Sequence, residues 1–221
     1  MNFIRAHKWL LGILVIAALF RFWQINSLQA GLFPDEAANG LDVNSILSGD
    51  LHPFYERGNG REALFFYFLA AAVALFGRGP WQHHMVSAGF GLAEVLVTYF
   101  LTKRLFSHRI ALLTSFFMAA SSYAVTLSRT AFRANTVPLF TTLTILFLVK
   151  FFQSDQPKTK MGSAIAAGVS FGLGFYTYIS YRMMIPLLLV IGLLIAFAYR
   201  DRFSEIIRTY WRYKLAFVAA F

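Results

Sequence analysis

Apolar residues occur along this chain in long runs that basic or polar stretches separate. The first run extends from about Trp9 to Leu28 and is interrupted by Arg21, whose long side chain is expected to reach the lipid interface. A polar stretch of about residues 29–62 follows, and then a short apolar stretch, Ala63–Gly77. The longer runs after it are Met85–Thr102, Ile110–Leu127, Thr136–Phe152, Gly162–Ile179 and Met183–Tyr199, and a further one begins at Leu215. This pattern predicts an all-α fold, a polytopic transmembrane helical bundle.

The composition agrees with a membrane protein. Hydrophobic residues make up 58% of the 221 residues and charged residues only 14%, whereas a soluble domain has about a quarter of charged residues. The net charge of +10 does not indicate nucleic acid as a partner, because the Lys and Arg residues lie between the apolar runs, where membrane topology uses them. The absence of cysteine excludes disulfides, thiolate catalysis and zinc–thiolate sites.

The basic residues also predict the topology. If Ala63–Gly77 does not cross the membrane, 13 of the 20 Lys and Arg residues share the cytoplasmic side, in residues 1–8, 103–109, 150–160 and 200–214. If it crosses, that total falls to 6, so the positive-inside rule favours the first arrangement. The stretch would also span only ~22 Å as a helix, less than the ~30 Å of a hydrocarbon core. We therefore expect a juxtamembrane helix there and a cytoplasmic N-terminus, in a multi-pass protein of the cell membrane.

This topology gathers charged residues of both signs on the outer face. Six of the ten acids fall in the first outer loop, namely Asp35, Glu36, Asp42, Asp50, Glu56 and Glu62. The same face receives five arginines, Arg57, Arg61, Arg129, Arg133 and Arg182. Acids for proton or metal chemistry beside arginines for phosphate oxygens are the combination that a phosphorylated substrate needs.

The sequence Phe33-Pro34-Asp35-Glu36 lies just after the first apolar run and has two interpretations. It can simply start a helix, because proline suits the first turn and acids there complement the helix dipole. It can also be catalytic, with one carboxylate deprotonating an acceptor hydroxyl while the other orients it or binds a divalent cation (Mg, Mn or Ca). The position at the membrane–water boundary favours the catalytic interpretation.

Two pairs of outer charged residues carry the next hypotheses. Arg129 and Arg133 are four residues apart and would share one face of a helix, as a clamp for a lipid phosphate or as a contact to lipid headgroups at a helix end. Arg61 and Glu62 follow a glycine-rich turn and are either interface charges or the border of the same pocket.

Several other polar residues are interpreted as structural. Glu94 lies in the middle of an apolar run, where an acid is a functional candidate; we expect it to be protonated and hydrogen-bonded to a neighbouring helix. His83 and His84 would point about 100° apart on a helix, which is poor geometry for a shared metal. An interfacial aromatic belt is predicted for the tyrosines at Tyr176, Tyr178 and Tyr181.

The order of these motifs resembles the N-terminal part of the GT-C glycosyltransferases. It is similar in particular to the bacterial family 39 group, relatives of protein O-mannosyltransferases and of the aminoarabinose transferase that acts on lipid A. The matching residues in this chain are Asp35-Glu36 after the first apolar run, Gly49-Asp50, Gly60-Arg61-Glu62, Lys103-Arg104-Leu105-Phe106 and Ser128-Arg129…Arg133. The resemblance spans nearly the whole chain, although family members are much longer and usually have proline where this chain has Ala63.

The resemblance implies a transferase that works at the outer face. The donor would be a sugar on a polyprenyl phosphate, and the acceptor a glycan, lipid or protein. Asp35 would be the general base in an inverting single displacement, and Glu36 would support it or help to hold a metal. Arg61, Arg129 or Arg133 would stabilise the departing lipid phosphate, with Glu62 and Asp50 in supporting positions. Residues 1–221 would then be the N-terminal part of a GT-C transmembrane domain, truncated, with an outer catalytic loop at about 29–84.

Two alternatives remain open from the sequence. A transporter or flippase would use Glu94 as a coupling acid and the loop acids as a gate, although no inverted repeat is visible. An inactive scaffold fragment is the other. The transferase hypothesis predicts that Asp35, Glu36 and the outer arginines converge on one cavity, whereas the transporter hypothesis predicts a polar path through the membrane that includes Glu94.

Overall fold

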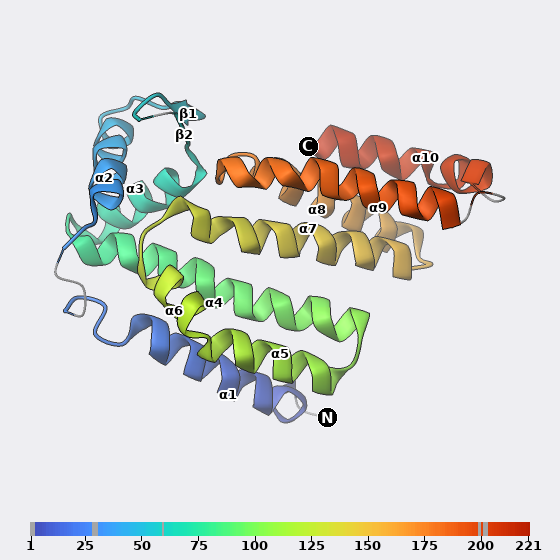
Figure 1. Ribbon diagram of the computed structural model, residues 1–221, viewed down its shortest axis with the longest axis horizontal. Helices are drawn as coiled ribbons and strands as arrows, with labels where there is room; N and C mark the ends of the chain where they lie inside the picture. Colours follow the sequence, from blue (N-terminus) through green and yellow to red (C-terminus); the bar gives the residue numbers. More distant parts are fainter. Residues whose placement is uncertain (1–2, 28–30, 59, 199, 201–202) are drawn as a thin grey trace.

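The computed structural model describes residues 3–27, 31–58, 60–198, 200 and 203–221. The predicted all-α bundle is confirmed (Figure 1). The helices of the bundle are α1 (Phe3–Phe22), α4 (Pro80–Leu105), α5 (His108–Ala120), α6 (Ser122–Arg129), α7 (Thr136–Gln153), α8 (Pro157–Gly174), α9 (Met184–Ala198) and α10 (Phe203–Ala220). Two short 3₁₀ helices are η1 (Arg133–Asn135) and η2 (Ile179–Met183). The predicted ends of the first run at Leu28 and of the last long run at Tyr199 lie outside the described residues.

The polar stretch after the first run folds into a cap at one end of the bundle. It contains α2 (Pro34–Leu47) and two short antiparallel strands, β1 (Phe54–Tyr55) and β2 (Arg61–Glu62), in which Phe54 pairs with Glu62. Figure 1 shows α2, α3 (Leu64–Phe76) and the strands together at this end, with the N-terminus at the other. The outer loop of the predicted topology is therefore a folded unit.

The α3 helix has the length that was expected of a juxtamembrane helix. It has 13 residues, or about 20 Å at 1.5 Å per residue, and remains at the same end of the bundle as α2 (Figure 1). Phe65, Phe66 and Leu69 are fully buried in the core that α3 shares with α2, α4 and α7. Packing inside the protein thus explains the apolar residues on one side of α3, whereas Phe68, Leu75 and Phe76 are exposed.

Some of these helices are long and apolar enough to cross a membrane. Three qualify among the described residues, Pro80–Leu105, Arg133–Gln153 and Ile179–Ala198, and a fourth if α5 and α6 form one span bent by 57°. The predicted single run Ile110–Leu127 is therefore divided, because Ser121 leaves helical geometry and its hydroxyl accepts a hydrogen bond from the Ala124 N–H (3.4 Å) at the start of α6.

The side chain of Arg21 was expected to reach the lipid interface, and this expectation is wrong. It is only 1% exposed and donates to the Ser128 hydroxyl (3.2 Å) and to the carbonyl oxygens of Ala17, Met118 and Ala119 (3.3, 3.2 and 3.1 Å). The last two carbonyls belong to the final turn of α5, where the helix dipole favours a cation. Arg21 thus joins α1 to the break between α5 and α6.

The α4 helix contacts α1, α3, α5, α6 and α7 and is the centre of the bundle. A side chain at Gly91 would meet the Ser128 hydroxyl at 2.0 Å, so glycine permits the close approach of α6. Further along α4, Glu94 is 6% exposed and accepts hydrogen bonds from Thr142 of α7 (2.9 Å) and Thr98 (3.1 Å). The predicted hydrogen bond between Glu94 and a neighbouring helix is confirmed, with Thr142 as the donor; the protonation of Glu94 stays a prediction.

Candidate active site

Glu36 starts the α2 helix and anchors it to the bundle. Its carboxylate oxygen Oε2 accepts from the backbone N–H of Phe33 (2.7 Å), and Oε1 accepts from the backbone N–H of Ala131 (2.5 Å), in the segment that joins α6 to η1. The side chain is fully buried. The helix-start interpretation therefore describes Glu36 well, although the anchor to Ala131 reaches much further along the chain.

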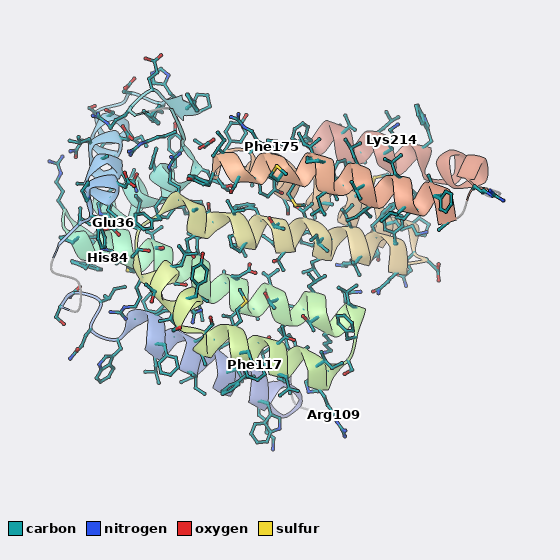
Figure 2. The ribbon with its side chains drawn as sticks, in the orientation of Figure 1. Glu36, His84, Arg109, Phe117, Phe175 and Lys214 are labelled. Carbon is teal, nitrogen blue, oxygen red and sulfur yellow. The ribbon has the colours of Figure 1, made fainter. Side chains whose placement is uncertain are left out.

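His84 lies beside the same carboxylate. Its Nε2 atom is 3.4 Å from Glu36 Oε1, without hydrogen-bond geometry, and Figure 2 shows both residues together where α2 meets the start of α4. Burial alone would raise the pKa of Glu36, but His84 and the two backbone N–H groups outweigh it, so this pKa lies below its usual value. Glu36 is thus held as a buried anion.

Asp35 has the opposite environment. Its side chain is exposed, and among the described residues its carboxylate has no hydrogen bond or ion pair. It lines a cavity of about 650 Å³ at the capped end of the bundle. The other charged or aromatic residues around this cavity are Phe54, Arg61, Glu62, Arg133, Tyr178 and Arg182. A free carboxylate therefore faces a group of arginines.

Two of these arginines share Glu62. The NH1 atom of Arg133 is 2.8 Å from Glu62 Oε2, and its guanidinium carbon lies 5.4 to 5.6 Å from the ring centres of Tyr178 and Phe66. The NH2 atom of Arg182 is 3.9 Å from the other oxygen of Glu62, and this side chain is 60% exposed. Arg133 is therefore fixed in the wall by charge and by aromatic contact, whereas Arg182 is loosely held at the mouth.

The third arginine is positioned by α2. Arg61 donates through NH1 to the Asn39 side-chain oxygen (3.0 Å) and lies 3.6 Å from Asp42 Oδ2. Asp42 in turn accepts a 2.8 Å hydrogen bond from Arg57. These contacts hold Arg61 in the cavity wall, with 12% of its side chain exposed.

Two predicted site residues lie elsewhere. The NH1 atom of Arg129 donates to the carbonyl oxygens of Phe20, Arg21 and Trp23 (3.1, 3.2 and 2.9 Å) at the end of α1. Arg129 also ends α6, so it does not share a helix face with Arg133, and the expected shared face is wrong. Asp50 pairs with exposed His52 at 2.7 Å and is not among the residues that line the cavity. A phosphate-binding role for Arg129 and a supporting role for Asp50 stay predictions.

Sequence reasoning missed some residues of the cavity. Tyr178 was assigned to an interfacial belt and instead lines the cavity, while Tyr181 is 1% exposed and hydrogen-bonds Thr144 (3.0 Å). Only Tyr176, 47% exposed, has the surface position expected of a belt. Asn39 lines a neighbouring pocket together with Asp35, Arg61 and Arg133. It carried no signal beyond its spacing of four residues from Asp35, which places both on one face of a helix.

Asp35 and Glu36 are the residues that were predicted to hold a divalent cation. Both oxygens of Glu36 are occupied by backbone N–H groups, so Glu36 does not fit a metal site shared with Asp35. Among the described residues, no group of three His, Cys, Asp or Glu side chains is arranged to hold a metal ion.

These helices and the cap at one end define an integral membrane fold of the GT-C glycosyltransferase class. A family model described as dolichyl-phosphate-mannose-protein mannosyltransferase matches residues 62–221, so the chain belongs to that family. The matched segment begins at Glu62 and does not include Asp35. No match was found among curated proteins.

Two solved structures share the fold, both of ArnT from Cupriavidus metallidurans. The form bound to undecaprenyl phosphate aligns with a TM-score of 0.77 at 18% identity, covering 97% of this chain and 39% of ArnT. The apo form aligns with a TM-score of 0.73 at 18% identity, covering 98% of this chain and 41% of ArnT. This chain therefore spans about two fifths of the ArnT length.

Proposed function

We propose that this protein takes part in glycosyl transfer from a polyprenyl-phosphate sugar to a hydroxyl group on the outer side of the membrane, with inversion at the sugar. The observation that carries the proposal is the Asp35 carboxylate, which has no hydrogen bond or ion pair within the described part of the chain. It lies in a cavity whose other charged residues are Arg61, Glu62, Arg133 and Arg182. Membership of a mannosyltransferase family and the ArnT-like fold support it.

The chemistry assigns one role to Asp35 and another to the arginines. The Asp35 carboxylate accepts the proton of the acceptor hydroxyl while that oxygen forms a bond to the anomeric carbon. The bond between this carbon and the phosphate oxygen breaks, and the polyprenyl phosphate leaves with an added negative charge. Arg61 and Arg133 stabilise that charge, because guanidinium groups donate to phosphate oxygens in a fork. Arg182, at the mouth, attracts the anionic donor.

The buried Glu36 acts in this scheme through position. It fixes the first turn of α2, on which Asp35 lies, against the backbone of Ala131. Because Glu36 does not fit a cation site, the mechanism needs no metal held by the Asp35–Glu36 pair.

The proposal also includes an orientation of the protein in the membrane. The capped end of the bundle faces outward and the N-terminus is cytoplasmic, as the distribution of Lys and Arg residues predicts. Figure 2 places Arg109, in one of the predicted cytoplasmic loops, at the other end from Glu36 and His84. The acceptor is a glycan, lipid or protein that reaches the cavity from the outer side.

The experiment that tests the proposal is transfer of a labelled sugar in membranes from a polyprenyl-phosphate donor. The full chain is compared with Asp35→Asn, which keeps the size of the side chain and removes the base. We expect transfer by the native chain and its loss in Asp35→Asn. Undiminished transfer by Asp35→Asn would remove Asp35 from the mechanism.

The transporter alternative gains no support from Glu94. This carboxylate is buried between α4 and α7, where it accepts hydrogen bonds from two threonines. It is not among the residues that line the cavity.

A further inference from the structure

Asn39 connects three segments around the cavity. It lies on α2, one helical turn after Asp35 and one turn before Asp42, so the three side chains follow one face of the helix. Its side chain is 3% exposed. The side-chain oxygen accepts from Arg61 NH1 (3.0 Å), and the side-chain nitrogen donates to the Ala131 carbonyl oxygen (2.9 Å).

The chemistry of both partners requires a carboxamide here. Arg61 can only donate and a backbone carbonyl can only accept, so the side chain between them must accept on one side and donate on the other. An ionised aspartate would accept from Arg61 and leave the Ala131 carbonyl without its donor. A leucine would satisfy neither.

Arg61 depends strongly on this contact. Its other close partner in the described part of the chain, Asp42 Oδ2, is 3.6 Å away and makes no hydrogen bond. Asp42 is instead hydrogen-bonded to Arg57. The direction in which the Arg61 guanidinium points is therefore set by Asn39, on the same helix face as Asp35.

We propose that Asn39 is a positioning residue for the transfer reaction. It fixes the Arg61 guanidinium relative to the Asp35 carboxylate, so that the cation meets the leaving phosphate while the base takes the proton. The same side chain ties this pair to Ala131, two residues before Arg133. This inference rests on the proposed function.

The test measures kcat and KM for sugar transfer by the full chain and its variants in membranes. We expect Asn39→Leu to lower kcat by about 10- to 100-fold, the effect of losing a hydrogen bond to a charged group, with a smaller change in KM because the charge on the phosphate grows in the transition state. Asn39→Asp retains an acceptor for Arg61 and should recover part of the loss. The matched control is Asn44→Ala, an exposed asparagine on the same helix.

A double substitution separates positioning from general destabilisation. If Asn39 acts through Arg61, adding Asn39→Leu to Arg61→Ala lowers kcat no further, whereas losses that multiply indicate a separate structural effect and overturn the inference. Thermal unfolding of each purified variant identifies any that fails to fold.

The remaining outcomes distinguish this inference from the proposed function. Undiminished transfer by Asp35→Asn contradicts the proposed function. Loss of transfer in Asp35→Asn together with native kinetics in Asn39→Leu overturns the inference alone. If the native chain transfers no sugar, binding of polyprenyl phosphate is measured instead. The inference is supported if Asn39→Leu weakens this binding in the native chain but not in the Arg61→Ala variant. Unchanged binding by Asn39→Leu overturns the inference.

Discussion

Two neighbouring carboxylates at the start of α2 have opposite environments. Glu36 is fully buried, and both of its oxygens accept from backbone N–H groups. Asp35 is exposed and has no partner among the described residues. Successive residues of a helix point about 100° apart, so one side chain enters the packed junction of α2 with α4 and residue 131, while the other enters the cavity.

This difference separates stability from chemistry. A fully buried carboxylate that accepts backbone hydrogen bonds stabilises the folded state but lies out of reach of a substrate proton. A carboxylate without partners adds little to folding and is available as a base.

The largest effect is expected for the base itself. Asp35→Asn should lower kcat for sugar transfer by about 10²- to 10⁴-fold, the range for a general base. The thermal unfolding temperature of the purified protein should stay at the native value, because Asp35 has no partner to lose. A large decrease in that temperature would contradict the contrast between the two carboxylates.

Glu36→Leu should have a mainly structural effect. It leaves the N–H groups of Phe33 and Ala131 without acceptors, which is expected to cost about 3 kcal/mol of unfolding free energy. The measurement is denaturant or thermal unfolding in detergent. Glu36→Gln keeps one acceptor oxygen and is the milder control; equal stability of Glu36→Leu and the native chain would contradict the anchoring role.

Arg133 should affect catalysis more through shape than through charge. Arg133→Lys keeps the cation but loses the planar contact with Tyr178 and Phe66 and the fork for phosphate. We expect kcat/KM to fall by about 10-fold, as for the loss of one good charged hydrogen bond. Native kcat/KM in Arg133→Lys would show that a point charge is sufficient at this position.

The pH dependence of stability offers another test of Glu36. Its folded pKa is below the ordinary value of 4.5, so the unfolded state binds the proton more readily, and stability falls as the pH drops below about that value toward the folded pKa. Unfolding temperatures between pH 7 and pH 3 should decrease less steeply in Glu36→Gln, since this side chain does not titrate. Parallel curves for the two proteins would assign the acid sensitivity to other groups.

The smallest effect is expected at the cavity mouth. Arg182 is 60% exposed and 3.9 Å from Glu62, and exposed ion pairs contribute only about 0–1 kcal/mol. Arg182→Ala should therefore raise the KM for the donor by about 3-fold, an increase that high salt reduces. A loss of kcat as large as that of Arg133→Lys would place Arg182 at the reacting phosphate.

The sequence predicted the parts of the fold that depend on local pattern. The long apolar runs and the short stretch Ala63–Gly77 predicted the helices, because burial in a membrane protein leaves a continuous apolar signal. The bend after Ala120 was missed, since it depends on Ser121 and on Arg21, which lies about 100 residues earlier in the chain. Arg21 was expected at the interface because its carbonyl partners cannot be inferred from sequence.

The site was predicted in part for the same reason. Asp35, Arg61, Glu62 and Arg133 do line one cavity, as their charge and predicted outer position suggested. Glu36 could not be told from Asp35 by residue type, because the difference comes from the helix face and from Ala131, 95 residues away. The contacts of Arg129 with the carbonyl oxygens at the end of α1 could not be predicted, because these carbonyls have no sequence signal; its phosphate-binding role stays a prediction.

The buried Arg21 has a consequence for the synthesis of the protein. Its carbonyl partners Met118 and Ala119 are 97 and 98 residues later in the chain, so at about 5–20 residues per second the ribosome needs roughly 5–20 s to produce them. A buried guanidinium without partners is costly, so we expect Arg21 to stay hydrated during this interval. We therefore expect α1 to reach its final position only when α5 and α6 arrive, and Arg21→Leu to let it settle earlier during translation.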